Sequence, residues 1–368
     1  MSEPCILFAG GGSGGHVFPM LAVAEELTRL EPHARVIFVG TARGQEARLV
    51  PERGYTLELV EVSPIRGGGL TGAMRGVRSA ALSLPSAVSL VRKHRPKLVF
   101  SIGGYAAGPV ALAARSLGVP LAVLEPNAEI GLSNRLIAPL AQRAYIAFPR
   151  TRRWFSSSVV RETGVPIRSG FEPAEFPAGS PQVLVLGGSQ GAKSLNERVP
   201  QALARLQSRP QVIHQCGSAH AEATRELYAS VGLSERVRVL PFIADMPRAL
   251  AEAQLVIGRA GAGAVSEICA VGRGSLLIPY PFAGDHQRFN TQAMVECGAS
   301  VVLSDVDATP ERLSQELEGL LRSPLRLQNM ARAARGLGRP HAAAEIARDL
   351  LSLAGSSTAS SQPSGEVV

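Results

Sequence analysis

Short apolar runs alternate along the chain with longer stretches in which apolar residues recur at helical spacing. The runs predict strands that are covered on both faces, as in a parallel sheet. In the first half we expect strands at 5–9, 35–39, 56–60, 98–102, 121–124 and 144–148. In the second half we expect strands at 183–186, 211–215, 236–240, 255–258, 275–279 and 300–303. Because helical patterns lie between the strands, an α/β fold is predicted.

Each half begins with a strand that runs directly into a glycine-rich turn and then into a helix. The first turn is Gly10–Gly15, with a helix from about Phe18, and the second is Gly187–Gly191. Glycine turns of this kind let backbone amides approach a phosphate, and the helix N-terminus adds partial positive charge. Two such units predict two Rossmann-like parallel-sheet domains that face a shared cleft.

The chain is expected to divide into two domains at a linker near residue 164. The first domain would cover residues 1–164 and the second residues 165–340. The last helical pattern, at about 341–354, is expected to pack back on the first domain. Residues 355–368 are rich in serine and have no apolar period, which predicts a disordered tail.

Charge and composition narrow the class of partner. The formal net charge of +8 fits an acidic partner such as a nucleic acid, an anionic lipid or a phosphorylated substrate. Aromatic residues make up 5% of the chain, which is too few for base-stacking surfaces, so no nucleic-acid partner is expected. The first strand begins too close to Met1 for a signal peptide. The charge-free stretch 98–114 is broken by glycines, which argues against a transmembrane helix.

Neither the cysteines nor the acidic residues have the spacing of a metal site. The four cysteines are Cys5, Cys216, Cys269 and Cys297. They form no CxxC pair, and we expect buried free thiols. Asp305-Val-Asp307 has the form of a DxD motif, but it lies between a late strand and a helix beginning near Thr309. We therefore interpret it as a loop and helix cap.

The first glycine turn has the GxGxxG spacing of dinucleotide-binding proteins. Such a site also needs an acidic residue at the end of the second strand to hold the ribose. That place is Gly40-Thr41, and the next carboxylate is Glu46, in the following helix. An NAD site is therefore not expected. The chain also has no GxxxxGK[ST] motif, which excludes a P-loop nucleotidase.

Two ionisable residues lie directly after glycine turns. At a helix N-terminus His16 could accept a hydroxyl proton as a general base, or it could be a hydrogen-bonded histidine with no chemical role. Glu267 follows the turn at Gly261 and could accept two hydrogen bonds from a sugar diol, or it could complement the helix dipole. The segment 279–287 ends another strand with clustered polar residues, and we expect it to line the same cleft.

Taken together, these motifs resemble those of the MurG family of glycosyltransferases of peptidoglycan synthesis, which have the GT-B fold. The matching segments are 10–19, 103–105, 187–191, 259–267 and 285–287, together with Glu125, Asn127 and 131–134. They run in unbroken order over about residues 5–353. The resemblance implies inverting transfer of GlcNAc from UDP-GlcNAc to the MurNAc C4 hydroxyl of undecaprenyl-diphosphate-linked muramoyl-pentapeptide. This step converts lipid I to lipid II.

The resemblance also implies which residues contact the substrates. In the second domain these are Arg168 and Ser189 for the diphosphate, the Ile243 backbone for uracil, Glu267 for the ribose and Gln287 for GlcNAc, with Ala262 and Val265 in the same junction. In the first domain Ser13, Gly14, Gly15, His16, Glu125 and Asn127 would meet the sugars, with His16 or Glu125 as the base. Neither a metal nor a cofactor is implied, because glycine amides, a helix dipole and arginine can stabilise departing UDP.

The chain departs from the family pattern in one segment. It has Leu124-Glu-Pro-Asn127 where the family usually has His-Glu-Gln-Asn. The leucine removes one candidate polar contact, and Pro126 removes a backbone amide and stiffens the loop.

A lipid-linked acceptor implies peripheral attachment to the cytoplasmic side of the inner membrane. Segments 70–97 and 150–155 combine apolar residues with arginines, which suits an anionic membrane surface. The same composition is also that of an ordinary amphipathic helix and a solvated loop.

Other functions fit the same motifs. One is a UDP-sugar transferase with a diacylglycerol or natural-product acceptor, and another is a UDP-GlcNAc 2-epimerase. A third is a regulatory protein that binds a nucleotide sugar without turnover, which the changes at Leu124 and Pro126 suggest.

Overall fold

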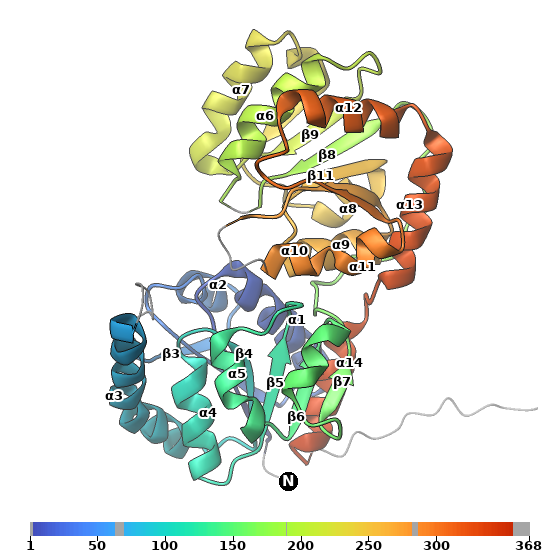
Figure 1. Ribbon diagram of the computed structural model, residues 1–368. Coiled ribbons are helices and arrows are strands. Elements are labelled where there is room, and N and C mark those ends of the chain that lie inside the picture. Colours follow the sequence, from blue (N-terminus) through green and yellow to red (C-terminus); the bar gives the residue numbers. More distant parts are fainter. Residues whose placement is uncertain (1–2, 63–69, 189, 282–285, 356–368) are drawn as a thin grey trace, which may run out of the picture. The chain divides into compact units, whose positions relative to one another are not determined.

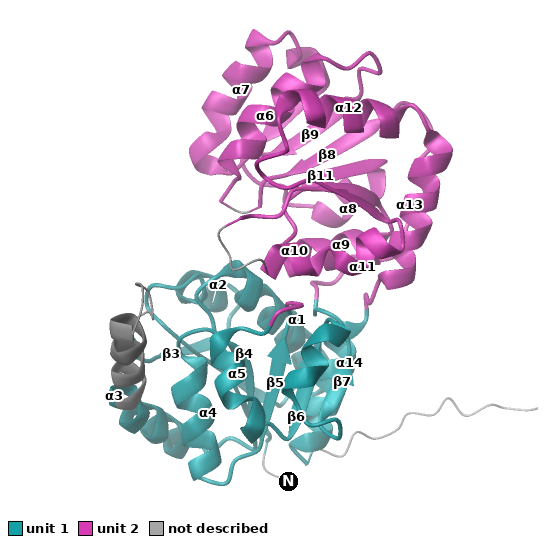
Figure 2. Cartoon of the chain, in the orientation of Figure 1, with its two compact units in different colours: residues 1–126, 130–166, 341–368 teal, residues 127–129, 167–340 magenta. Residues whose placement is uncertain are grey.

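The computed structural model describes residues 3–62, 70–188, 190–281 and 286–355, and only the backbone over 70–81. The chain forms two compact units (Figure 2). Unit 1 contains residues 1–126, 130–166 and 341–368, and unit 2 contains residues 127–129 and 167–340. The tail predicted to be disordered lies outside the described residues from residue 356 onward.

Unit 1 is built on a seven-stranded sheet in which all neighbouring strands are parallel. Its order is β3-β2-β1-β4-β5-β6-β7. The strands are β1 (Cys5–Gly10), β2 (Arg35–Gly40), β3 (Thr56–Leu59), β4 (Leu98–Gly103), β5 (Leu121–Glu125), β6 (Arg143–Ile146) and β7 (Val160–Glu162). The sequence predicts all of these except β7, which has one buried residue and two exposed ones and therefore no apolar run.

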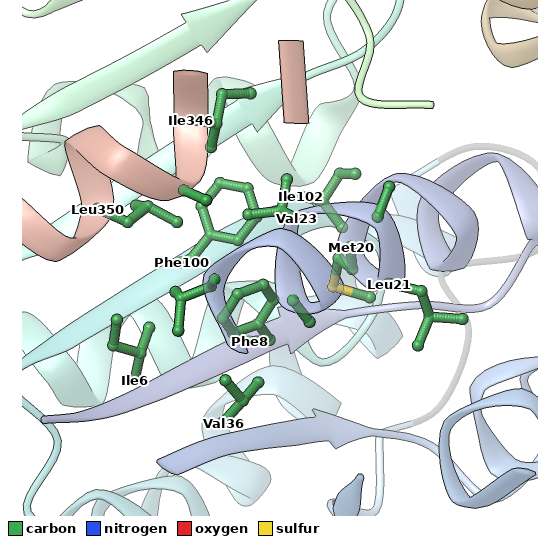
Figure 3. Close-up of a cluster of buried hydrophobic side chains, with 14 of the residues drawn as sticks. Ile6, Phe8, Met20, Leu21, Val23, Val36, Phe100, Ile102, Ile346 and Leu350 are labelled. Carbon is green, nitrogen blue, oxygen red and sulfur yellow. The ribbon is translucent and has the colours of Figure 1, made fainter. Parts of the chain in front are cut away.

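The helices of unit 1 cover both faces of this sheet (Figure 1). They are α1 (Gly14–Leu30), α2 (Glu46–Glu52), α3 (Leu70–His94), α4 (Ala107–Ser116), α5 (Leu132–Ile137), η1 (Ala138–Leu140), η2 (Pro149–Trp154) and α14 (Ala342–Leu353). Successive residues of β1 enter opposite cores: Phe8 packs with α1 and α14, whereas Leu7 packs on the side of α4. Figure 3 shows Ile346 and Leu350 of α14 in the first of these cores.

Unit 2 repeats the architecture with a six-stranded parallel sheet of order β10-β9-β8-β11-β12-β13. Its strands are β8 (Gln182–Leu186), β9 (Gln211–Gln215), β10 (Val237–Leu240), β11 (Leu255–Gly258), β12 (Gly274–Leu277) and β13 (Ser300–Val302). Its helices are α6 (Lys193–Ala204), η3 (Ser218–His220), α7 (Ala221–Ser230), η4 (Ser234–Arg236), α8 (Met246–Glu252), α9 (Ala262–Val271), α10 (His286–Asn290), α11 (Gln292–Glu296), α12 (Pro310–Leu321) and α13 (Pro324–Leu337).

The strand order of both sheets confirms the predicted α/β class with two Rossmann-like sheets. In each sheet the order reverses at one place, between β1 and β4 in unit 1 and between β8 and β11 in unit 2. Ligands of such sheets bind outside the carboxyl ends of the strands at this switch point. The two glycine turns begin there, at Gly10 at the end of β1 and at Gly187 directly after β8.

Three local predictions are wrong. Cys297 is exposed at the end of α11, although the other three cysteines are buried. The first helix begins at Gly14 and not near Phe18, so the last glycines of the turn are helical. Residues 150–155, predicted as a loop, lie mostly in the short 3₁₀-helix η2.

Candidate functional site

His16 lies in the first turn of α1, after the glycine turn that ends β1. Ser13 is the exposed N-cap residue, and Gly14 and Gly15 are the first two residues of the helix. Nδ1 of His16 is 3.0 Å from the carbonyl oxygen of Gly11. Because a carbonyl oxygen can only accept, Nδ1 carries the proton and Nε2 of the neutral ring is an acceptor. A half-buried imidazole in this tautomer can serve as a general base.

Glu125, the other candidate base, is buried at the end of β5 and bonded to the start of α5. Its Oε2 accepts hydrogen bonds from the Gly131 amide and from Nδ2 of Asn134, both at 3.0 Å. Beside it, Leu124 is fully buried in the apolar core that α1 and α14 cover. Position 124 therefore packs in the core, which corrects the expectation that its change removes a polar site contact.

Asn127 belongs to unit 2. There Asn290 bonds both to Asn127 and to Ala260, which lies just before α9. Nδ2 of Asn290 donates to the side-chain oxygen of Asn127 at 3.4 Å and to the carbonyl oxygen of Ala260 at 3.2 Å. The side-chain oxygen of Asn290 accepts from the Ala128 amide at 2.9 Å. Asn290, which the sequence analysis missed, thus joins segment 127–128 to the N-terminal side of α9.

Gln287 lies one turn before Asn290 in α10, and its side chain also bonds to the backbone of Ala260. Its Oε1 accepts hydrogen bonds from the amides of Ala260 at 3.1 Å and Tyr280 at 2.9 Å. Because both partners are donors, they fix the orientation of the carboxamide. The NH₂ group of Gln287 therefore faces away from them and can donate to a ligand.

Gln215, at the end of β9, ties the second glycine turn to Ile243. Its buried side chain donates from Nε2 to the Gly188 carbonyl at 3.1 Å and accepts at Oε1 from the Ile243 amide at 3.0 Å. The Ile243 amide is therefore occupied, and its carbonyl is the backbone group with which it can contact a nucleobase. Ser189, predicted to bind the diphosphate, lies outside the described residues.

The turn itself requires glycine at one close approach to β9. Gly191 has φ of +80°, and a Cβ there would lie 1.9 Å from the carbonyl oxygen of Cys216. A side chain would be strained by the backbone angle and would also collide with backbone. The second turn is thus packed against the end of β9, just before α6 begins.

The structure brings Arg168 and Glu267 together, with 3.6 Å between Nη2 and Oε1. Burial raises the pKa of Glu267 to about 7, although Arg168 lowers it. A carboxyl group with this pKa changes charge near neutral pH, and its ionised form is the better acceptor for a diol. Ala262 and Val265 lie on the first turns of the same helix and are both buried, so they contribute packing.

Asp305 and Ser194, the latter in the first turn of α6, both contact Arg259, the residue that directly follows β11. Arg259 Nη1 lies 2.6 Å from Asp305 Oδ1, and Nη2 donates to Ser194 Oγ at 2.7 Å. Ser194 in turn donates to Asp305 at 3.0 Å. Asp305 lies in a loop as predicted, but the predicted helix cap is wrong: Thr309 caps α12 by accepting from the Arg312 amide.

Within the described ranges, no group of three or more His, Cys, Asp and Glu side chains is placed to hold a metal ion. In the same part of the chain, no helix combines the length and apolar character needed to cross a membrane. The chemistry gathered in unit 2 is instead that of a polar ligand with anionic groups: glycine amides, an arginine, a carboxylate and a carboxamide.

Comparison with known proteins identifies the same two regions. Residues 6–146 match the glycosyltransferase family 28 N-terminal domain, and residues 182–349 match the glycosyltransferase family 28 C-terminal domain. A relative from Sorangium cellulosum is 51% identical over 95% of this chain and 88% of its own length. It is named UDP-N-acetylglucosamine–N-acetylmuramyl-(pentapeptide) pyrophosphoryl-undecaprenol N-acetylglucosamine transferase.

Two further matches agree. A relative of the same name from Anaeromyxobacter dehalogenans is 42% identical over 93% of this chain and 91% of its own. Among solved structures, the crystal structure of Acinetobacter baumannii MurG matches with a TM-score of 0.79 at 33% identity. That match covers 95% of this chain and 99% of the other.

Proposed function

This chain belongs to the MurG family within glycosyltransferase family 28, and we propose that it makes lipid II. It transfers GlcNAc from UDP-GlcNAc to the MurNAc C4 hydroxyl of undecaprenyl-diphosphate-linked muramoyl-pentapeptide, with inversion at the anomeric carbon. The observation that carries this proposal is sequence identity of 51% and 42%, over 95% and 93% of this chain, to relatives named for the same transfer.

We assign the donor to unit 2. Glu267 accepts from the two ribose hydroxyls, Arg168 beside it reaches a phosphate, and the Ile243 carbonyl accepts the imino N–H of uracil. The amides of the second glycine turn and Ser189 hold the diphosphate. The positive end of the α6 dipole then favours the charge that develops on departing UDP.

Gln287 is the proposed contact for the transferred sugar. Its oxygen is held by two backbone amides, so its NH₂ group is oriented and can donate to a GlcNAc hydroxyl or acetamido oxygen. Ala262 and Val265 form the packed base of this region, since both are buried.

We assign the acceptor to unit 1 and prefer His16 to Glu125 as the base. Glu125 is buried and engaged with Gly131 and Asn134, so it orders the start of α5. Nε2 of His16 takes the proton of the C4 hydroxyl, and the hydroxyl oxygen bonds to C1 of GlcNAc. The bond from C1 to the UDP oxygen breaks, and its electron pair leaves with UDP.

Ser13, Gly14, Gly15 and Asn127 complete the proposed sugar contacts. The first three lie at the start of α1, where the first amides of a helix have no partner inside the helix. These amides can donate to hydroxyls of the acceptor. Asn127 is held by Asn290, which gives its side chain a defined position.

We also propose that the enzyme acts as a peripheral protein on the cytoplasmic face of the inner membrane. Its acceptor carries an undecaprenyl chain, which stays in the bilayer. Unit 1 supports the proposal with exposed leucines on α4 and α5, including Leu132 and Leu136, and with arginines of η2 such as Arg153.

The test is transfer of labelled GlcNAc from UDP-GlcNAc to a lipid I analogue by the purified full-length chain. We expect a labelled disaccharide lipid, formed equally well with and without a metal chelator. A parallel reaction without acceptor measures 2-epimerisation of UDP-GlcNAc, which we expect to be absent. A folded protein that binds UDP but transfers nothing would contradict the proposal.

A further inference from the structure

Glu46 is a buried carboxylate in unit 1 that the reaction described above does not use. It is the first residue of α2, and 1% of its surface is exposed. Its Oε2 accepts from the Gly12 amide at 2.7 Å, and its Oε1 accepts from the amide of Thr41 at 3.0 Å and from its hydroxyl at 3.1 Å. A charged helix residue that turns inward to a glycine turn calls for an explanation beyond helix stability.

The surroundings of this carboxylate are shaped to hold it. A Cβ at Gly11, Gly40 or Gly44 would lie within 2.5 Å of a side-chain atom of Glu46. These glycines come from three separate places: the first glycine turn, the end of β2 and the segment before α2. None of these glycines could carry a side chain without a shift of Glu46, so together they leave the room that its side chain fills.

One peptide unit connects Glu46 to His16. The Gly12 N–H that donates to Glu46 and the Gly11 carbonyl that accepts from His16 Nδ1 belong to the same peptide bond. In a trans peptide the N–H and C=O lie in one plane and point in opposite directions, so the carboxylate and the imidazole lie beyond opposite edges of one rigid planar unit. Hydrogen bonds linked in this way polarise and strengthen one another.

We propose that Glu46 is a positioning residue for His16 and acts through the Gly11–Gly12 peptide. By polarising this peptide it fixes the tautomer with the proton on Nδ1, which leaves Nε2 as the base. When Nε2 takes the acceptor proton, the Gly11 carbonyl stabilises the imidazolium, and no proton crosses the peptide. Catalytic triads achieve the same with a carboxylate that contacts the imidazole directly.

The inference rests on the proposed function, and Glu46→Gln tests it with little change in volume. Glutamine offers one oxygen, which cannot accept from both Gly12 and Thr41, and its NH₂ group must face a donor. We expect kcat for transfer to the lipid I analogue to fall by about 10- to 100-fold, because general-base catalysis contributes up to about 10⁴-fold. KM for UDP-GlcNAc should stay within about twofold, because Glu46 lies in unit 1 and the donor is assigned to unit 2.

Glu52→Gln is the matched control, because Glu52 ends the same helix, is exposed and pairs only with Arg48 among the described side chains. It should leave kcat unchanged. Thr41→Val is the second variant, in case Glu46→Gln does not fold. It removes one donor to Oε1, and we expect a smaller loss of kcat in the same direction.

The tautomer of His16 distinguishes the two possible roles of Glu46. If Glu46 only stabilised the fold, its replacement would not change this tautomer. Nitrogen-15 NMR of histidine in the full-length protein should show the Nδ1–H form for His16 in the wild type and in Glu52→Gln. In Glu46→Gln the Nε2–H form should become populated. An unchanged tautomer together with an unchanged kcat in Glu46→Gln would overturn the inference. If instead the wild type transfers nothing to lipid I, the proposed function fails, and the tautomer still decides whether Glu46 orients His16.

Discussion

Glu267 is the residue whose charge decides how the proposed donor site behaves near neutral pH. Its carboxyl is largely buried in α9, and Arg168 lies 3.6 Å away, too far for a strong hydrogen bond. Burial therefore outweighs the arginine and raises the pKa of Glu267 to about 7. A ribose diol supplies two hydroxyl donors, and these need the ionised form.

We predict that UDP binds more weakly as the pH falls through 7. With a pKa of about 7, the ionised fraction of Glu267 falls roughly tenfold from pH 8 to pH 6. Calorimetric titration of UDP at these values should show a loss of affinity of the same order in the wild type. Glu267→Gln is the control, since it has no titrating group but the same ligand. Equal pH slopes in the two proteins would remove Glu267 from the ribose contact.

At the scale of single residues, the sequence indicates candidates that follow a motif, and it gives no sign of residues whose bonding partners are distant in the chain. His16 and Glu267 each follow a glycine turn, which makes them visible in the chain. Gln215 bonds to groups 27 and 28 residues away, and Glu46 bonds to an amide 34 residues away. Their partners are backbone atoms, which every residue has, so no local pattern indicates the pairing.

Arg273 acts at the scale of elements, because it joins the ends of two helices in unit 2. It is fully buried and donates to carbonyls of Leu250 and Ala251 at the end of α8 and of Val271 and Gly272 at the end of α9. It also donates to Ala174 and Glu175. Carbonyls at a helix end have no partner inside the helix, and a cation there complements the dipole.

We predict that Arg273→Lys destabilises unit 2 although the charge is kept. A lysine ammonium has three donors and cannot replace a guanidinium that reaches six carbonyls. Each buried carbonyl left unpaired costs about 1–3 kcal/mol. Three of the six carbonyls keep another donor, because Leu250 accepts from the Ala253 amide, Val271 from the Ala174 amide and Ala174 from Arg335. Hydrogen-exchange protection of α8 and α9 should therefore fall by about 1–3 kcal/mol for each of the other carbonyls that the ammonium does not reach. Arg332→Lys, at an exposed site on α13, should leave it unchanged.

Elements with a clear period were predictable, and those defined by tertiary contacts were not. The buried runs that form β1 and β8 are visible because both faces of a parallel strand are apolar. The strand β7 escapes notice because Arg161 and Glu162 are exposed at the edge of the sheet. The start of α1 at Gly14 was also hidden, since glycine has low helix propensity and the helix is fixed by packing.

At the scale of the whole molecule, one face of unit 1 carries exposed apolar residues together with arginines. The helices α3, α4 and α5 pack side by side and cover one core of the sheet. Leu132 and Leu136 on α5 are 57% and 66% exposed and lie four residues apart, so they share a helix face. Arg135 stacks over the ring of Trp154 at 4.3 Å from its centroid.

Such a surface is costly in water and suits a boundary between lipid headgroups and acyl chains. If unit 1 docks on a membrane as proposed, we expect its exposed leucines in the acyl region and its arginines and tryptophan at the headgroup level. Each arginine near an anionic surface adds about 1 kcal/mol of attraction. Segment 150–155, which the sequence analysis expects to suit an anionic membrane surface, contains Arg150, Arg152 and Arg153. Side chains of 70–81, in the other expected segment, lie outside the described residues.

We predict that Leu132→Glu combined with Leu136→Glu weakens binding to vesicles that contain anionic phospholipid by at least about tenfold. The two glutamates remove apolar area that the leucines would bury in the bilayer, which is worth about 25 cal/mol per Å². They also add repulsion from the charge of the anionic lipids. Co-sedimentation with vesicles of phosphatidylglycerol and phosphatidylethanolamine measures the loss.

The matched control places the same two charges on unit 2, at Val306 and Leu325, which are 81% and 67% exposed. Vesicle binding should then be unchanged. Calorimetry with UDP should give wild-type affinity for both double variants, because neither pair lies among the proposed donor contacts. If the unit 1 variant binds vesicles as the wild type does, α5 is not the docking surface. Equal losses in both variants would instead assign membrane attraction to overall charge, since only that property changes alike in the two proteins.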